Sequence, residues 1–450
     1  MLSKKVPANQ LGFYSTFEEQ LSHRHPLYIL SNRVNWHQFD TCFAPLYCLD
    51  NGRPAKPIRL MVALLILKHI RNLSDESVVE QWAENSYYQY FSGEKVFASG
   101  EPCEASELVH FRNRIGADGI ELIFKESIRI NGKDGQEDAV SSDTTVQEKN
   151  ITFPTDAKLH KKIIAGCKQI AAKEGLPVRQ SYTQVIKKLS YDQRFRNHPR
   201  NKGKARKADK KIKTIAGRLV REIERNLPAN SPDTSGYHTQ INLFKKVLAQ
   251  GKNSSPKIYS LHEPAVQCIA KGKEHKKYEF GNKVSITYTQ NTGVIVGAKS
   301  FRNEYDGHIL APALEQVERL VGKAPKTATV DRGYKGNTII GTTQILIPKP
   351  FDTKKMNAYQ QKKHRKHFKR RAAIEPIIGH LKTDNRLSRN YYKGIIGDEI
   401  NVLLSAAAFN FKRMLNKWKA SFLAFLQNSF YLLCRLLCSQ LNNLQLKLAF

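Results

Sequence analysis

The sequence is short of acidic residues relative to basic ones. Only 40 Asp and Glu stand against 73 Lys and Arg, which leaves a formal net charge of +33 at pH 7. This balance excludes an acidic, solvating disordered chain, and an ordinary metabolic enzyme has no need of it. A hydrophobic share of 40% is enough for a buried core, so wholesale disorder is excluded as well. The basic excess predicts a polyanionic partner, either nucleic acid or an anionic membrane surface.

Paired cysteines and long apolar runs are also lacking. The seven cysteines are odd in number and scattered, with no Cys-x-x-Cys, so we expect neither a disulfide framework nor a zinc ribbon, and a reducing cytosol fits. The longest uncharged, apolar-leaning stretch, residues 420–434, is interrupted by Gln427 and Asn428. It falls short of the ~20 residues that a membrane-spanning helix needs. No apolar run follows the first ten residues, so no secretory signal is expected. Nucleic acid is therefore the favoured partner.

Residues 1–132 have the pattern of a helical domain. An apolar helix is predicted over residues 58–71, and Ser74 is expected to cap a second helix over 75–91 that ends near Gly93. Short helices joined by tight turns are compatible with a helix-turn-helix unit. We therefore expect a helical N-terminal domain that binds DNA, with a domain that only packs as the alternative.

Residues 133–415 have a different pattern, in which strands and helices alternate. The sequence predicts a mixed α/β domain with a mixed sheet flanked by helices. A very basic helical insertion interrupts it at about 157–257, and an apolar helical tail follows at 416–450. The expected strands lie at 138–146, 277–288, 293–299, 327–330 and 344–347, with a helix at 310–321 after the hairpin.

Three carboxylates stand out in this basic chain. Asp143 lies in a strand-like run, Asp331 directly follows the predicted strand 327–330, and Glu375 follows a basic stretch. Magnesium prefers oxygen ligands and is commonly held by carboxylates, waters and substrate phosphates. Two such ions support an in-line phosphoryl transfer. Each acid also has a structural alternative, since an Asp at a strand end often forms a turn and a Glu on a helix often pairs with Arg.

The residues around Glu375 add a helical spacing. Phe368, Arg371, Glu375, Gly379 and Lys382 are three, four, four and three residues apart, which places them along one face of an α-helix. Such a face combines a carboxylate with phosphate-binding cations, although an intrahelical ion-pair ladder would have the same spacing. Pro376 requires either a kinked helix or a helix that begins near Glu375.

These motifs together resemble those of the DDE transposases of bacterial insertion sequences, whose catalytic domain is RNase H-like. The family's Tyr, Arg, Glu, Lys signature is matched by Phe368, Arg371, Glu375 and Lys382, with Phe in place of Tyr. The second aspartate resembles the family's Asp-Arg-Gly-Tyr at 331–334, and the first its Ser-Ser-Asp-Thr-Thr at 141–145. The segment 52–93 resembles the helical N-terminal domain of these enzymes, so the likeness covers roughly residues 10–415.

The resemblance implies a set of site residues. Asp143, Asp331 and Glu375 would be catalytic and would hold two Mg²⁺ ions, with Mn²⁺ as an alternative; Asp156 is the second choice for the first aspartate. Arg371 and Lys382 would contact phosphate or orient Glu375. A zinc site at His364, His367 and His380 is a weaker alternative, because no cysteine accompanies them. The residues expected to bind DNA phosphates are Arg332, Arg371, Lys382, Lys363, Arg365, Lys369, Arg370, Lys204, Arg206, Lys207, Lys210 and Lys211.

The resemblance also implies the activity. A transposase of this kind would bind the inverted repeats of its element, cleave the ends and join the freed 3′-hydroxyls to target DNA. Its partners would be double-stranded DNA and a second copy of itself in the synaptic complex, on the nucleoid of a bacterial cytoplasm and not on a membrane. The alternatives are a metal-dependent nuclease or recombinase without strand transfer, and a DNA-binding protein that has lost catalysis.

Overall fold

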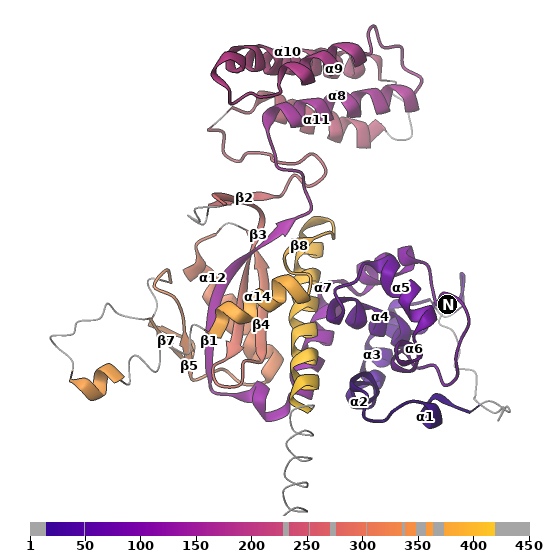
Figure 1. The fold of residues 1–450 in the computed structure, drawn as a ribbon, viewed down its shortest axis with the longest axis vertical. Coiled ribbons are helices and arrows are strands. Elements are labelled where there is room, and N and C mark those ends of the chain that lie inside the picture. The colour runs from indigo at the N-terminus through magenta and orange to yellow at the C-terminus, as the bar shows by residue number, and fades with distance from the viewer. Residues whose placement is uncertain are drawn as a thin grey trace, which may run out of the picture. The chain divides into compact units, whose positions relative to one another are not determined.

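The computed structural model of the protein consists of two compact units (Figure 1). It describes residues 15–48, 50–227, 234–251, 253–270, 276–302, 304–334, 338–347, 357–362 and 373–418. The first unit is formed by Met1–Gln147, Lys283–Tyr392 and Ile396–Phe450. The second is formed by Glu148–Asn282 and Lys393–Ile395. In the described part of the chain, no helix is both long and apolar enough to cross a membrane.

The N-terminal part of the first unit is helical, as the sequence predicts. Every residue of α4 except Arg59 is buried, because its apolar side chains extend all round the helix. A helix of this kind belongs to the core and offers no free face to DNA. The helices are α1 (Phe17–Gln20), α2 (Pro26–Arg33), α3 (Trp36–Phe43), α4 (Ile58–Ile70), α5 (Asp75–Glu84), α6 (Ser86–Ser92) and α7 (Ala105–Ile130).

The single helix expected over 75–91 is wrong, because the chain breaks at Asn85. Ser74 caps α5 as predicted, accepting the N–H of Ser77 at 3.0 Å. Asn85 then leaves the helical conformation, and its side chain accepts the N–H groups of Tyr87 and Tyr88, which starts α6. Gly93 ends α6 in the left-handed conformation, as expected.

The sheet combines parallel and antiparallel pairs. Its order is β2-β3-β1-β5-β7-β6, with β4 paired to β3 and β8 to β1. β1 pairs with β5, and β5 with β7, in parallel, whereas β3 pairs with β2 and with β4 in antiparallel fashion. The strands are β1 (Ala139–Lys149), β2 (Gln267–Ala270), β3 (Tyr278–Thr289), β4 (Ile295–Phe301), β5 (Thr327–Thr329), β6 (Ile339–Ile340), β7 (Thr343–Leu346) and β8 (Arg389–Asn390). The five predicted strands thus correspond to β1, β3, β4, β5 and β7.

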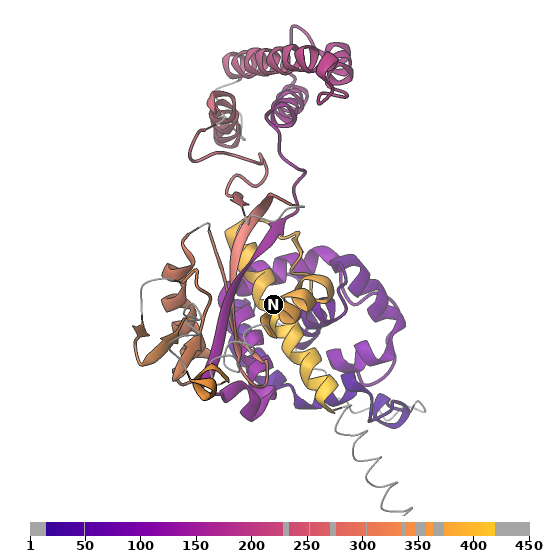
Figure 2. The same ribbon diagram turned by 60° about the vertical axis from the view of Figure 1, so that its left-hand side comes forward.

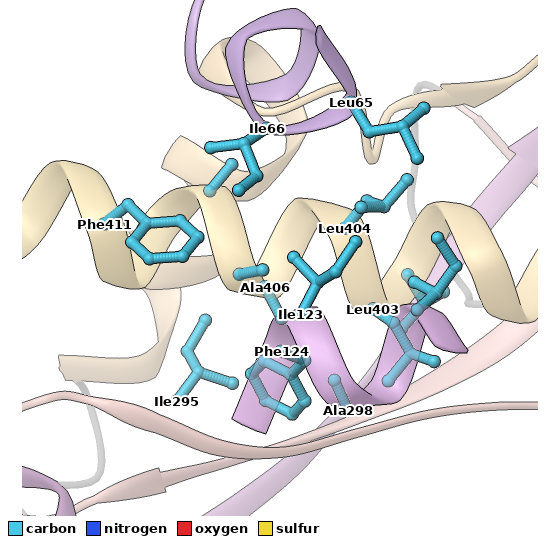
Figure 3. Close-up of a cluster of buried hydrophobic side chains, with 14 of the residues drawn as sticks. Leu65, Ile66, Ile123, Phe124, Ile295, Ala298, Leu403, Leu404, Ala406 and Phe411 are labelled. Atoms are coloured by element: carbon cyan, nitrogen blue, oxygen red, sulfur yellow. The ribbon is translucent and has the colours of Figure 1, made fainter. Parts of the chain in front are cut away.

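Helices pack against this sheet in the first unit. α12 (Asp306–Val321) lies against β4, where Gln316 accepts the N–H of Ala298 at 2.9 Å. A Cβ at Gly297 would lie only 2.9 Å from Val317, so this close approach needs glycine. The C-terminal helix, described over residues 394–418, lies between α4 on one side and α7 with β4 on the other (Figure 3). α14 (Ile374–Asp384) contributes Ile374, Ile377 and Leu381 to the same core.

The second unit contains a helical bundle with its own core. Its helices are α8 (Asp156–Lys173), α9 (Thr183–Asp192), α10 (Pro199–Asn226) and α11 (Thr234–Ala249). Within this bundle the long α10 lies over α8 and α11 (Figure 2). Apolar residues recur along α10 every three or four positions, from Ala208 through Ile212, Ile215 and Leu219 to Ile223, and all are buried. α10 is therefore amphipathic, with one face fixed in the bundle core.

Candidate active site

Asp143 and Asp331 are brought together by the parallel pairing of β1 and β5. The register joins Ala139 to Thr327 and Ser141 to Thr329, and Asp143 and Asp331 each come two residues after this last pair, on β1 and on the segment that follows β5. Residues paired in this way point to the same face of adjacent strands, about 4.8 Å apart. Both side chains are partly exposed. The two predicted aspartates therefore follow the last paired positions of β1 and β5, at the point where β5 has just ended.

The backbone around each aspartate is ordered by short hydrogen bonds. One oxygen of Asp143 accepts the N–H of Thr144 at 2.7 Å. Asp331 accepts the N–H of Arg332, and its carbonyl accepts the N–H of Tyr334 at 3.1 Å, which closes a turn. The Asp-Arg-Gly-Tyr motif is thus a tight turn at the end of β5, with Arg332 exposed and Tyr334 buried.

The Tyr334 hydroxyl lies in a buried place close to the negative charge of Asp143. Burial raises the pKa of the Tyr334 hydroxyl, and the nearby carboxylates of Asp143 and Asp306 raise it further. The ring is 3% exposed. The hydroxyl therefore keeps its proton throughout the physiological range, and a second acid, Asp306, lies near the first aspartate.

Asp306 lies beside the candidate site, and the sequence alone assigns it no role there. It is the first residue of α12, which begins four residues earlier than the expected helix at 310. Its carboxylate accepts the Thr144 hydroxyl at 2.8 Å and the Lys283 ammonium at 2.8 Å. An acid in the first turn of a helix is common for electrostatic reasons alone, so its only sequence signal is ambiguous.

The neighbouring Tyr305 holds the other aspartate segment. Its hydroxyl donates to the carbonyl of Gly333 at 2.5 Å, within the turn that follows Asp331. Tyr305 and Asp306 therefore attach the start of α12 to both chain segments that carry the predicted aspartates. The sequence places these two residues in a loop; only the fold shows what they contact.

Glu375 lies at the start of α14. Of the two alternatives that Pro376 left open, a kinked helix or a helix that begins near Glu375, the structure has the second. The helix begins at Ile374, so Pro376 occupies its first turn, where its missing N–H costs no hydrogen bond. Glu375 is exposed, while its neighbours Ile374 and Ile377 are buried. Within the described ranges, no group of three His, Cys, Asp or Glu side chains is arranged to hold a metal ion. The paired strands β1 and β5 therefore lead to both aspartates, but in the described part of the chain no three-carboxylate cluster forms with Glu375.

The remaining predicted residues fall into separate places. Asp156 begins α8 in the second unit and forms an ion pair with Lys257 at 3.4 Å. Lys382 is half-buried in the last turn of α14. Lys204 pairs with Asp192 at 3.0 Å, whereas Arg206, Lys207, Lys210 and Lys211 are exposed on α10. Lys363, Arg365, Lys369, Arg370 and Arg371 lie outside the described residues, as does Phe368.

The weaker zinc hypothesis gains nothing from the described histidine. The His380 ring donates to the Asp384 carboxylate at 3.1 Å. The hydrogen bond from Thr383 and then this one lower the pKa of Asp384 to about 2. His364 and His367 lie outside the described residues. Asp384 is also paired with Lys412 at 3.2 Å. His380 is thus part of a local ion-pair group on α14.

Comparison with known proteins adds to this geometry. Residues 15–114 match a family described as "Transposase domain (DUF772)", and residues 260–411 match the "Transposase DDE domain" family. The second match contains Asp331 and Glu375 and implies an RNase H-like domain, whose members generally use divalent metal ions. The chain is 38% identical to the uncharacterized protein ORF8 in the nfe locus of Rhizobium meliloti over 193 residues, 42% of this chain and 93% of that protein. No solved structure matches. On these two domains and this relative, the chain belongs to the DDE-type transposases of insertion sequences.

Proposed function

We propose that this transposase binds the terminal inverted repeats of its element, cleaves the DNA at the ends and joins the 3′-hydroxyls to target DNA by two-metal phosphoryl transfer. The observation that supports the proposal is the parallel pairing of β1 with β5, because Asp143 and Asp331 each lie two residues beyond its last pair. The net charge of +33 supplies the attraction for the DNA polyanion.

The donor groups fit a hard divalent cation. In the proposal Asp143, Asp331 and Glu375 hold two Mg²⁺ or Mn²⁺ ions, and the two aspartates offer only oxygen donors. The hydroxyls of Ser141 and Thr329 lie two residues behind them on the same face, are buried, and have no hydrogen-bond partner among the described residues. The buried positions below the two aspartates are therefore polar. Such surroundings are more suitable for a hydrated metal ion than apolar surroundings would be.

Each group has a distinct task in the proposed reaction. The bound ions supply activation of the attacking oxygen and stabilisation of the leaving oxygen. Asp143 and Asp331 fix the position at which the scissile phosphate must lie, and Glu375 completes the set when DNA is bound. Arg332 and Lys382 contact phosphates on either side, together with the cations of residues 363–371.

We assign a separate role to each part of the chain. Residues 1–132 form the helical domain that binds DNA, residues 133–415 form the catalytic domain with its insertion at 157–257, and residues 416–450 form the tail. Two copies act together in the synaptic complex, on the bacterial nucleoid in the cytoplasm. Joining two element ends requires both ends to be held at once, which a dimer achieves directly.

The test compares the site acid Asp331 with a matched acid, Asp138, directly before the start of β1. Asp138 precedes β1 and pairs with Lys323 at 2.7 Å and Lys326 at 2.8 Å. The purified full chain is given duplexes that carry the two DNA ends flanking its gene, with Mg²⁺, and products are separated on a denaturing gel. We expect Asp331→Asn to bind these ends but to give no cleaved or joined strands, whereas Asp138→Asn gives both.

The products decide between this function and its alternatives. Cleavage without joined strands identifies a nuclease or recombinase that lacks strand transfer. Binding without cleavage by the unaltered protein identifies a DNA-binding protein that has lost catalysis. Normal cleavage by Asp331→Asn would show that the acidic site is misassigned.

A further inference from the structure

We propose that the exposed face of α10 is an interface for the sugar–phosphate backbone of duplex DNA, bound without regard to sequence. This inference rests on the proposed function only in taking DNA as the partner. It concerns the second unit, whose bundle has a hydrophobic core of its own. It extends beyond the individual basic residues that the sequence indicated, because the fold selects which of them share one face.

The cations of α10 form a stripe and are not spread around the helix. At about 100° per residue, seven of them lie within about 60° of Thr214 when viewed down the helix axis. All seven side chains are exposed. We call this set the α10 stripe: Arg200, Lys207, Lys210, Lys211, Arg218, Arg221 and Arg225. It spans 25 residue steps, or about 38 Å, close to the length of one turn of duplex DNA.

The acids of α10 leave the stripe uncompensated. Asp209 pairs with Arg196, Glu224 with Lys245, and Glu222 accepts the N–H of Arg179 at 2.7 Å. All three therefore have partners on other segments, and all lie off the stripe. In the part of the chain that the structure describes, no ion pair joins a stripe cation to a carboxylate. These charges remain available for an external anion.

Hollows flank the stripe on both sides. One, of about 560 Å³, lies between α10 and the segment around Tyr182, and stripe residues Lys207, Lys211 and Arg218 line it. The other, of about 740 Å³, lies between α10 and α11, with Arg221 and Lys245 in its lining. Because the cations lie between two hollows, phosphate groups can approach them along both edges of the helix. On a flat charged surface, phosphates could not approach the cations as closely.

The remaining chemistry favours duplex DNA over the other polyanions. A membrane-surface helix must insert an apolar face, but the apolar face of α10 is already buried in the bundle. Binding of single strands relies on aromatic side chains that stack on bases. The non-cationic positions of the stripe are Gly203, Thr214 and Gly217, so it has no aromatic residue. Contacts from such a surface go to phosphates and carry no sequence information.

The experiment uses two triple variants of the full chain with the same loss of charge. The stripe variant is Lys207→Gln, Lys211→Gln and Arg218→Gln. The matched variant is Lys162→Gln, Lys187→Gln and Lys202→Gln, three exposed cations of the second unit that lie off the stripe and outside both hollows. Affinity for a random-sequence duplex of about 30 base pairs is measured by fluorescence anisotropy, without divalent metal, between about 50 and 200 mM KCl.

We expect the stripe variant to weaken binding and to make the plot of log affinity against log salt shallower by about 2.7, because three phosphate contacts are lost. The matched variant should change this slope by less than one contact's share. A charge-keeping variant, Lys207→Arg, Lys211→Arg and Arg218→Lys, should keep the slope of the unaltered protein, which separates loss of charge from loss of folding.

Other outcomes would overturn the inference. Equal slope changes in the two triple variants would mean that only net charge matters. An unchanged slope in the stripe variant would mean that DNA does not contact it. Loss of binding to vesicles that contain phosphatidylserine, with DNA binding intact, would identify a membrane surface instead. Because no metal is present, failure of the cleavage assay would refute the proposed function without affecting this comparison.

Discussion

Arg112 in the first unit and Arg218 in the second show two opposite uses of the same side chain. Arg112 is 4% exposed, and its two terminal guanidinium nitrogens each donate a hydrogen bond to Asp75, at 2.7 and 2.8 Å. Lys68, also buried, adds a contact to Asp75 at 2.8 Å. Arg218 is exposed on the α10 stripe, and among the residues that the structure describes no carboxylate forms an ion pair with it. A basic residue that is paired inside a core contributes to the fold, and one left unpaired outside contributes to binding.

The charges of the buried group formed by Asp75, Arg112 and Lys68 are paired with one another. Burial alone would raise the pKa of Asp75, but the hydrogen bonds and charges of Arg112 and Lys68 outweigh it and lower that pKa. Both cations also lie over the ring of Tyr392, 4.4 and 4.7 Å from its centre. The excess of +33 therefore divides into cations that are already engaged and cations that are not, and only the second kind indicates a partner.

The largest expected effect comes from breaking the buried pair. Arg112→Met should lower the free energy of unfolding of the first unit by about 3–5 kcal/mol, because it leaves the Asp75 charge buried with one partner. All three tryptophans, Trp36, Trp82 and Trp418, lie in the first unit, so tryptophan fluorescence during urea unfolding reports on it alone.

Arg114→Met is the matched control, because Arg114 belongs to the same helix and carries the same charge but is exposed. It rests over the ring of Tyr47, so a loss of no more than about 1 kcal/mol is expected. Equal losses in the two variants would mean that burial does not distinguish these cations.

A pH change should also affect the first unit through His69. Burial, and then the charge of Lys68, lowers the pKa of His69 from 6.5 to about 3. Between these two pH values the unfolded chain binds a proton that the folded protein excludes. Stability is therefore lost as the pH falls from about 6.5 towards 3, by about 3 kcal/mol at pH 4.

The measurement for His69 is the difference between two pH profiles. His69→Gln keeps an N–H that can donate to the Leu65 carbonyl, the contact that the ring makes at 3.1 Å, but it cannot take up a proton. Urea unfolding followed by tryptophan fluorescence should show a smaller loss between pH 7 and pH 4 for the variant. Parallel profiles would mean that His69 is protonated in the folded protein.

Asp306 tests whether a paired charge near the candidate site supports catalysis. Asp306→Asn removes the charge that holds Lys283 and weakens the acceptor for Thr144, next to Asp143. We expect cleavage to fall about tenfold, equivalent to about 1.4 kcal/mol, and the Mg²⁺ concentration needed for half-maximal rate to rise. The rate is measured on the element ends over a Mg²⁺ series.

Glu304→Gln is the control for Asp306, because it removes an exposed charge only two residues away. Lys283 donates to the backbone carbonyl of Glu304 at 2.8 Å, and the substitution leaves this carbonyl in place. Its rate and metal dependence should match those of the unaltered protein. If Asp306→Asn slows cleavage with no change in metal dependence, its role is to stabilise the start of α12.

The sequence predicted the elements that carry the site better than the contacts between them. The strands that hold Asp143 and precede Asp331 were expected from local runs of small and β-branched residues. Their parallel register joins segments 188 residues apart, as Ser141 and Thr329 show, and no local pattern specifies such a pairing. Asp306 was missed because its partners Thr144 and Lys283 come from two other strands.

The missed helix break has a local cause. The polar and apolar pattern continues through Asn85, and the pattern alone favours one helix. The Asn85 side chain competes by accepting two backbone N–H groups, which ends one helix and starts the next. The burial of Arg112 could not be predicted from the sequence either, because its carboxylate partner Asp75 belongs to another helix. The composition alone does not distinguish this buried pair from charges on the surface.

The smallest expected effects belong to single cations of α10. Arg218→Gln and Lys204→Gln should each change the free energy of unfolding by less than about 0.5 kcal/mol, since both side chains are exposed. Their effects on DNA should differ. Arg218 lies on the stripe, so its loss should reduce the salt slope by about 0.9, the share of one phosphate contact. Lys204 lies at the edge and is 3.0 Å from Asp192, which already neutralises part of its charge. Its loss should therefore change the slope less, as measured by anisotropy on the random-sequence duplex. A larger change for Lys204→Gln than for Arg218→Gln would mean that the DNA follows the edge of α10 and not the stripe.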